Sequence, residues 1–191
     1  MMRHKWLVGI LGVVGGIAVS APAAAEPATA NSLQLGIGFR YGFEMEDGDF
    51  NPWGPGIGAA VGYTLPSALY LGGAFDYFFG EEADFDSDIP GLSGSVSGNI
   101  WQLMAEGGYD LGSGPFVFRP KLGVGFASLN GEFCAGDDCQ DNSETDFAIA
   151  PGATFLYIGD KISLSVDLRY DIIFAEDESL NALIFSAGIG F

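Results

Sequence analysis

Seven charged residues, both acidic and basic, lie in segments whose other residues are mostly apolar or small. They are Arg40, Asp76, Glu106, Arg119, Lys121, Asp167 and Arg169. A charge that is removed from water needs a partner of opposite sign, because an unpaired buried charge is strongly unfavourable. The sequence therefore predicts a buried network of balanced charges that plugs the interior. The alternative is a gate, in which the same pairs separate and open a narrow pore for small solutes or ions.

Three of these charges flank one short turn. If Leu111 pairs with Phe116 across that turn, Glu106 lies opposite Lys121 and diagonal to Arg119. Cross-strand neighbours at this spacing can form ion pairs. We therefore expect Glu106 to neutralise the two basic side chains on the next segment.

The two cysteines, Cys134 and Cys139, are separated by four residues in an acidic, polar stretch. In an exported protein such a pair predicts a disulfide that shapes the tip of a loop. Metal binding by two thiols is the alternative. It is disfavoured because no histidine accompanies them.

Asp84, Asp86 and Asp88 alternate along the chain like the first ligands of a calcium loop. The pattern then fails, since Ile89 replaces the expected glycine and Ser95 replaces the expected bidentate glutamate. We interpret the segment as a solvated acidic loop. Weak, multi-site binding of divalent cations is the alternative, and no confident metal site is assigned.

Histidine-dependent catalysis is excluded, because the only histidine, His4, lies in a segment that we expect to be removed. Ser-His-Asp and Cys-His arrangements are then impossible in the mature chain. The abundant carboxylates leave an acid-only enzyme open, but their spacing singles out no pair. We predict a non-enzymatic protein without a cofactor.

Eight segments that could position these side chains alternate between apolar residues and small or polar ones. They span residues 33–43, 56–65, 69–79, 99–111, 116–129, 145–157, 162–174 and 181–191. A period of two places the two sets on opposite faces of a strand. About ten residues per strand is the length that a tilted membrane strand requires. Pro120 and Pro151 interrupt two segments, and we expect a bulge or a local strand break at each.

The connections between the segments alternate in length. Three are tight turns, near residues 66–68, 112–115 and 158–161, and four are longer loops, near residues 44–55, 80–98, 130–144 and 175–180. Most acidic residues lie in the longer loops, whereas outward aromatic residues form two bands near the strand ends. This arrangement is typical of a membrane barrel, with charge kept off the lipid-facing wall. Aromatic residues that fill a soluble sandwich core are the alternative.

The last residues alternate up to a terminal aromatic, with Phe185, Ile189 and Phe191 on the apolar face. This ending resembles the final strand of Gram-negative outer-membrane barrels, whose terminal aromatic is read by the barrel-assembly machinery. The whole mature chain resembles the small eight-stranded barrels of the OmpA/OmpX type. The resemblance implies an all-β fold, an eight-stranded antiparallel up-and-down transmembrane β-barrel in the outer membrane.

The first 25 residues combine a basic start, an apolar stretch interrupted by glycine and a run of small residues. This pattern predicts a cleaved signal peptide, residues 1–25, followed by a barrel domain, residues 26–191. An uncleaved anchor is the alternative. An even number of strands places both mature termini at the short-turn, periplasmic end and the long loops outside the cell.

Beyond the signal peptide, five basic residues stand against 25 acidic ones, which excludes a nucleic-acid partner. We expect a structural or surface-interaction protein. Its partners would be outer-membrane lipid and lipopolysaccharide, the assembly machinery during biogenesis, and an extracellular or host ligand. A narrow gated pore is the second interpretation. A soluble lipocalin-like barrel is the third, and it is disfavoured because the inward face is polar and small.

Overall fold

The computed structural model describes residues 29, 32–45, 51–81, 83–86, 93–135, 138–175 and 179–191, and only the backbone of residues 83–86, 93, 94, 96, 133, 135 and 138. The predicted signal peptide lies outside these ranges. The strands are β1 (Ser32–Glu44), β2 (Gly54–Thr64), β3 (Leu69–Phe78), β4 (Ala83–Asp86), β5 (Ser93–Tyr109), β6 (Phe116–Ala135), β7 (Asp138–Ile158), β8 (Ser163–Phe174) and β9 (Ser179–Gly190). No helix within the described ranges is long and apolar enough to cross a membrane.

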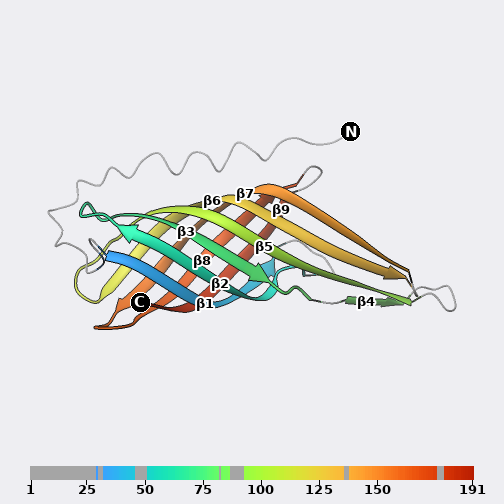
Figure 1. Cartoon of the computed structure of the whole chain (residues 1–191), viewed down its shortest axis with the longest axis horizontal. Helices are drawn as coiled ribbons and strands as arrows, with labels where there is room; N and C mark the ends of the chain where they lie inside the picture. Colours follow the sequence, from blue (N-terminus) through green and yellow to red (C-terminus); the bar gives the residue numbers. More distant parts are fainter. Residues whose placement is uncertain are drawn as a thin grey trace.

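Eight of the strands form a closed antiparallel ring, as the sequence predicts (Figure 1). Consecutive strands pair with one another, β3 pairs with β5, and β1 pairs with β9 to close the sheet. The ninth strand, β4, pairs only with β5 and lies outside the ring. Closure leaves no open edge along the ring, which is what a hydrocarbon environment demands of a sheet.

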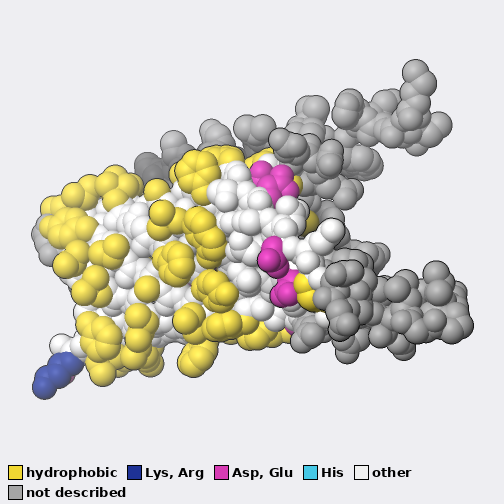
Figure 2. Space-filling view, turned by 45° about the vertical axis from the view of Figure 1, so that its right-hand side comes forward, with side chains coloured by type: hydrophobic (Ala, Val, Ile, Leu, Met, Phe, Trp, Pro, Cys, Tyr) yellow, Lys and Arg dark blue, Asp and Glu magenta, His cyan; other side chains and the backbone are white. Residues whose placement is uncertain are grey.

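The strands alternate between an apolar outer wall and a buried inner face. On β8, Leu164, Val166 and Leu168 are 53%, 43% and 47% exposed, whereas Asp167 and Arg169 are buried. Figure 2 shows outward apolar side chains over most of the barrel face in view, with acidic side chains toward one end. The prediction that the apolar face points outward and the charges point inward is confirmed.

Three strands extend well beyond the ring, which the sequence analysis did not predict. The segment 130–144, expected to be a loop, continues the β6–β7 ladder to its last pair, Ala135 and Asp138. Strand β5 likewise starts at Ser93 and pairs with β6 there. The β7–β8 ladder, in contrast, begins only at Ala148. The result is a projecting sheet of β5, β6 and β7, seen at the right of Figure 1.

Both prolines interrupt pairing without shifting the register. The β5–β6 ladder stops at Gly108 and Lys121, beside Pro120, and resumes as a single bridge between Leu111 and Phe118. The β7–β8 ladder skips the pair that would contain Pro151. The expected strand breaks are wrong, because β6 and β7 run through the prolines and pair with each other there. Proline lacks a backbone N–H, and the effect is a gap in pairing on one side of each strand only. An unchanged register rules out a bulge at either position.

Candidate functional site

Inward side chains from all parts of the ring meet in the lumen, in layers that run from the short-turn end to the long-loop end. The lower layer centres on Asp110, in the turn after β5. Arg119 Nε lies 2.5 Å from Asp110 Oδ1, and Arg119 Nη2 donates to Oδ2 at 2.9 Å. Thr29 and Thr64 also donate to Oδ2. Burial raises the pKa of Asp110, but the hydrogen bonds from Arg119, Thr29 and Thr64 outweigh it, so the pKa lies below its usual range.

The middle layer joins one lysine to two carboxylates. Lys121 Nζ lies 2.8 Å from Glu106 Oε1 and 3.0 Å from Asp167 Oδ2. Thr154 Oγ1 donates to the same Asp167 oxygen at 2.6 Å. Tyr70 connects the lower and middle layers. Its ring packs 3.7 Å from Arg119 Cζ, and its hydroxyl donates to Glu106 Oε2 at 3.5 Å.

The register expected across the β5–β6 turn is wrong. Leu111 pairs with Phe118 rather than Phe116, so Glu106 faces Gly123 and Lys121 faces Gly108. Glu106 still reaches Lys121 along the diagonal. Arg119 ion-pairs with Asp110 instead of Glu106. Gly112 and Gly114 in the turn adopt left-handed backbone conformations. Residue type alone did not specify this turn, and therefore did not fix the register of the strands it joins.

The upper layer is a chain of alternating charge. Arg40 Nε lies 2.8 Å from Asp76 Oδ1, and Arg169 Nη2 lies 2.7 Å from Asp76 Oδ2. Arg169 Nε lies 2.9 Å from Asp171 Oδ1, and its Nη2 donates to Gln102 at 2.9 Å. All seven sequence-predicted charged residues thus lie in the lumen. The described network also holds Asp110 and Asp171, so five acids stand against four bases.

Glycines on the inner face provide the room for these long side chains. A Cβ at Gly58 would lie 2.0 Å from Asp76 Oδ1 and 2.8 Å from Arg40 Cζ. A Cβ at Gly62 would meet the Tyr70 ring at 2.2 Å, and one at Gly152 would meet Arg169 Cβ at 2.5 Å. The glycine-rich inner face is therefore matched to the ion pairs.

An apolar lid covers the upper layer at the long-loop end. It consists of the buried side chains of Trp53, Phe78, Ile100, Ile173 and Ile184. Met104 belongs to the same apolar cluster but lies deeper, between Gln102 and Glu106 on β5. The side chain of Asn51 holds the turn before Trp53. Its Oδ1 accepts a hydrogen bond from the Trp53 backbone N–H, and its Nδ2 donates to the Gly42 carbonyl. The expectation that the inward face is polar and small throughout is therefore wrong at this end, where large apolar residues fill the lumen.

A polar cavity of about 100 Å³ remains below the lid. The ends of β8 and β9, at Ser163 and Gly190, line it, so it lies toward the short-turn end. Glu106, Lys121 and Asp167 also line it. Ser186 Oγ is buried beside this cavity without a partner among the described atoms. A polar cavity of this volume can hold several waters.

The closed ring, the outward apolar wall and the polar lumen can now be compared with known proteins. The model of a family described as outer membrane protein beta-barrel domain matches residues 10–191. The chain belongs to this outer-membrane β-barrel family. No curated protein sequence matches it.

Solved structures share the fold of this outer-membrane barrel at low sequence identity. Ail of Yersinia pestis is 16% identical with a TM-score of 0.57, over 83% of this chain and 97% of Ail. A major outer membrane protein of Thermus thermophilus is 15% identical with a TM-score of 0.57, over 84% and 100%. The N-terminal barrel domain of Pseudomonas aeruginosa OprF is 17% identical with a TM-score of 0.52, over 84% and 98%.

The C-terminal residues of the outer-membrane barrel lie on its outer wall. Phe185, Ile189 and Phe191 are exposed, and the backbone of Phe191 exchanges two hydrogen bonds with Leu35 on β1. The last strand thus closes the ring against the first. Recognition of these three residues by the assembly machinery stays a prediction.

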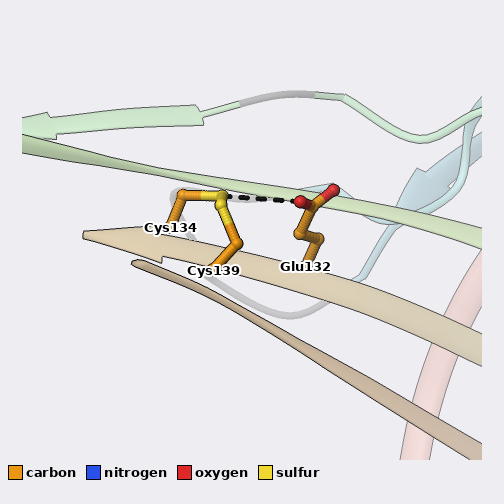
Figure 3. A group of neighbouring side chains, drawn as sticks. All are labelled: Glu132, Cys134 and Cys139. Atoms are coloured by element: carbon orange, nitrogen blue, oxygen red, sulfur yellow. Dashed lines mark hydrogen bonds between the residues drawn. A yellow bond between two sulfur atoms is a disulfide. The ribbon is translucent and has the colours of Figure 1, made fainter. Parts of the chain in front are cut away.

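The projecting hairpin of the outer-membrane barrel carries the predicted disulfide. Cys134 and Cys139 are bonded, with 4.1 Å between their Cα atoms. Glu132 lies beside them, 3.5 Å from Cys134 Sγ (Figure 3). The trio resembles a metal-ligand cluster only in spacing, because metal binding requires free thiolates. Of the acidic triad, Asp84 and Asp86 are described by their backbone in β4, and Asp88 lies outside the described residues.

Proposed function

We propose that this protein is a non-enzymatic structural and surface-interaction barrel whose lumen does not conduct. The observation that carries the proposal is the filling of the lumen in two ways. Ion pairs cross it in the lower, middle and upper layers, and the apolar lid covers them. An eight-stranded ring is about wide enough for side chains alone.

The charge network supports closure because its members hold one another. Removing one partner from a buried pair leaves an uncompensated charge, at a cost of about 3–5 kcal/mol. Arg169 has two carboxylate partners, Asp76 and Asp171. If it swung away, Asp171 would lose its ion-pair partner and Asp76 would keep only Arg40. An ion that entered would also have to cross the lid, where Trp53 and Phe78 pack edge to face with centroids 5.2 Å apart.

We infer that the long-loop end faces the outside of the cell and that both mature termini face the periplasm. The distribution of charge supports this orientation. Four of the five basic residues after Lys5 lie in the lumen and the fifth, Lys161, lies in the short turn between β7 and β8. Acidic loops without a lysine or arginine would set a negative surface charge next to lipopolysaccharide.

The proposal of an extracellular ligand is supported by Ail, a barrel of the same fold whose structure was also solved in complex with the heparin analogue sucrose octasulfate. The long loops of the present chain are acidic, so they would repel a polyanion. We therefore expect its extracellular ligand to be cationic or neutral rather than heparin-like.

A narrow gated pore is the second candidate, favoured by the polar cavity below the lid. Recording of the purified protein in planar bilayers separates the two. The closed barrel predicts no steady conductance at moderate voltage. Steady openings of the wild-type protein would contradict the closed barrel. If the barrel is a gated pore, Trp53→Ala removes part of the lid and should raise the open probability.

A further inference from the structure

The outward face of the projecting sheet changes character above the lipid-facing wall. On β5, β6 and β7 the outward residues Leu103, Phe126 and Phe147 form an apolar row. The outward residues two rows further on are Asn99, Asn130 and Ser143. Asn130 donates to Asn99 at 3.0 Å and accepts from Ser143 at 2.7 Å, so these side chains form a continuous polar row.

A groove of about 490 Å³ runs along this polar row. Its apolar wall is formed by Tyr77 and Phe79, whose rings meet edge to face at 5.2 Å. Phe79 is 54% exposed. Its acidic wall is formed by Glu132 and Asp141, which are directly paired across β6 and β7. The volume falls in the range of small-ligand sites.

Within the described part of the chain, no basic side chain neutralises the charges of the groove. Glu132 and Asp141 face each other on the same side of the ladder, an arrangement that is destabilising for like charges. No lysine or arginine is among the described residues that line the groove. The basic side chains of the described barrel are committed to the lumen and to the short turn at the opposite end, so a cation must come from outside.

We propose that this groove binds a linear organic cation with alkylammonium groups, of the polyamine class. The carboxylates attract the ammonium groups, and the polar row accepts further hydrogen bonds. The faces of Tyr77 and Phe79 attract an ammonium and pack against methylene groups. A small divalent ion matches the groove less well, since it requires six or more oxygen ligands in a compact shell.

Calorimetric titration of the purified protein in zwitterionic micelles at low ionic strength tests the site, with spermidine and Mg²⁺ as separate probes. We expect one spermidine site. Its affinity should fall at least about fivefold in the double variant Glu132→Gln, Asp141→Asn, from the loss of two exposed charge contacts. The matched control is Glu144→Gln, Asp146→Asn, which removes two carboxylates from the opposite face of β7 and should change affinity less than about twofold.

The aromatic wall is tested by the double variant Tyr77→Leu, Phe79→Leu, which should weaken spermidine about threefold and leave Mg²⁺ unchanged. An equal loss in both carboxylate pairs would mean diffuse attraction of counterions and would overturn the proposal. Spermidine affinity that survives the aromatic replacements would overturn it too, in favour of an inorganic-cation surface. The titration is independent of conductance, so its failure leaves the proposed closure of the lumen intact.

Discussion

At the scale of single residues, the lumen depends on which positions lack a side chain as much as on which carry a charge. Gly58 lies beneath the Arg40–Asp76 pair, and Gly152 lies beneath Arg169. The inward charges could be predicted from the sequence because they share the inner phase of the strands. Asp110 shares the phase of Glu106 inside the predicted segment 99–111, so alternation alone would have placed it in the lumen, although β5 ends at Tyr109.

Replacement of Gly58 by alanine tests this dependence. The added methyl group would lie 2.0 Å from Asp76 Oδ1, so the ion pair must shift, and we expect a loss of about 1–3 kcal/mol in the free energy of unfolding. Urea unfolding in micelles measures it. Gly107→Ala is the matched control, because nothing lies within 4 Å of a Cβ there. Equal effects of the two substitutions would contradict the account.

The lower layer predicts a pH dependence. The pKa of Asp110 is held below its usual value, so its ion pair stabilises the folded state above the unfolded pKa of about 3.9. That contribution is lost as the pH falls through the lower, folded pKa. The stability difference between wild type and Asp110→Asn should therefore be large at pH 7 and shrink toward pH 3. A difference that stays constant over this range would show that Asp110 is not ionised in the fold.

At the scale of strands, alternation predicted eight segments well and their ends poorly. The pattern exists because lipid and lumen select opposite side chains, and it fades where both faces of a strand leave the membrane. Residues 130–144 carry polar side chains in both phases, with Phe133 as the one large apolar residue. β6 therefore extends to Ala135, and β7 starts at Asp138, without a sequence signal. Turn-forming residues occur both in open loops and at the tips of paired hairpins, so they do not show where the pairing of two strands ends.

The outer wall of β8 gives a prediction at this scale. Val166 is exposed on the lipid side, and arginine there should destabilise the barrel by about 2–4 kcal/mol if the position lies near the bilayer midplane. Folding into lipid vesicles, followed by resistance to trypsin, measures the effect. Ile162→Arg, just before the start of β8, should cost at most about 1 kcal/mol. A Val166→Arg variant that folds as well as Ile162→Arg would contradict lipid exposure.

The disulfide should stabilise the hairpin tip rather than the ring. Cys134 and Cys139 are already opposite each other in the β6–β7 ladder and enclose a short loop. The double variant Cys134→Ser, Cys139→Ser should therefore cost about 2 kcal/mol or less. Hydrogen exchange should accelerate in residues 130–143 and stay slow in β8 and β9. Faster exchange throughout the ring would contradict a local role.

At the scale of the whole molecule, the chain forms a cylinder whose outer wall is apolar and whose lumen holds both ion pairs and an apolar lid. The charge layers could be anticipated from inward polar residues. The lid could not, because the sequence near the long loops places apolar residues in both phases, as in Phe78–Phe79, Ile100–Trp101 and Ile172–Ile173. Neighbouring apolar residues do not tell which member faces lipid, and pairing with the rest of the ring decides it.

The most direct measurement is paramagnetic broadening of side-chain signals in lipid nanodiscs, with the spin label on the lipid tails in one sample and on a water-soluble probe in another. The account predicts that lipid labels broaden Leu164, Val166 and Leu168, and that neither label broadens the upper-layer residues Arg169 and Asp171. Broadening of Arg169 by the aqueous probe, or protection of Val166 from lipid labels, would contradict it.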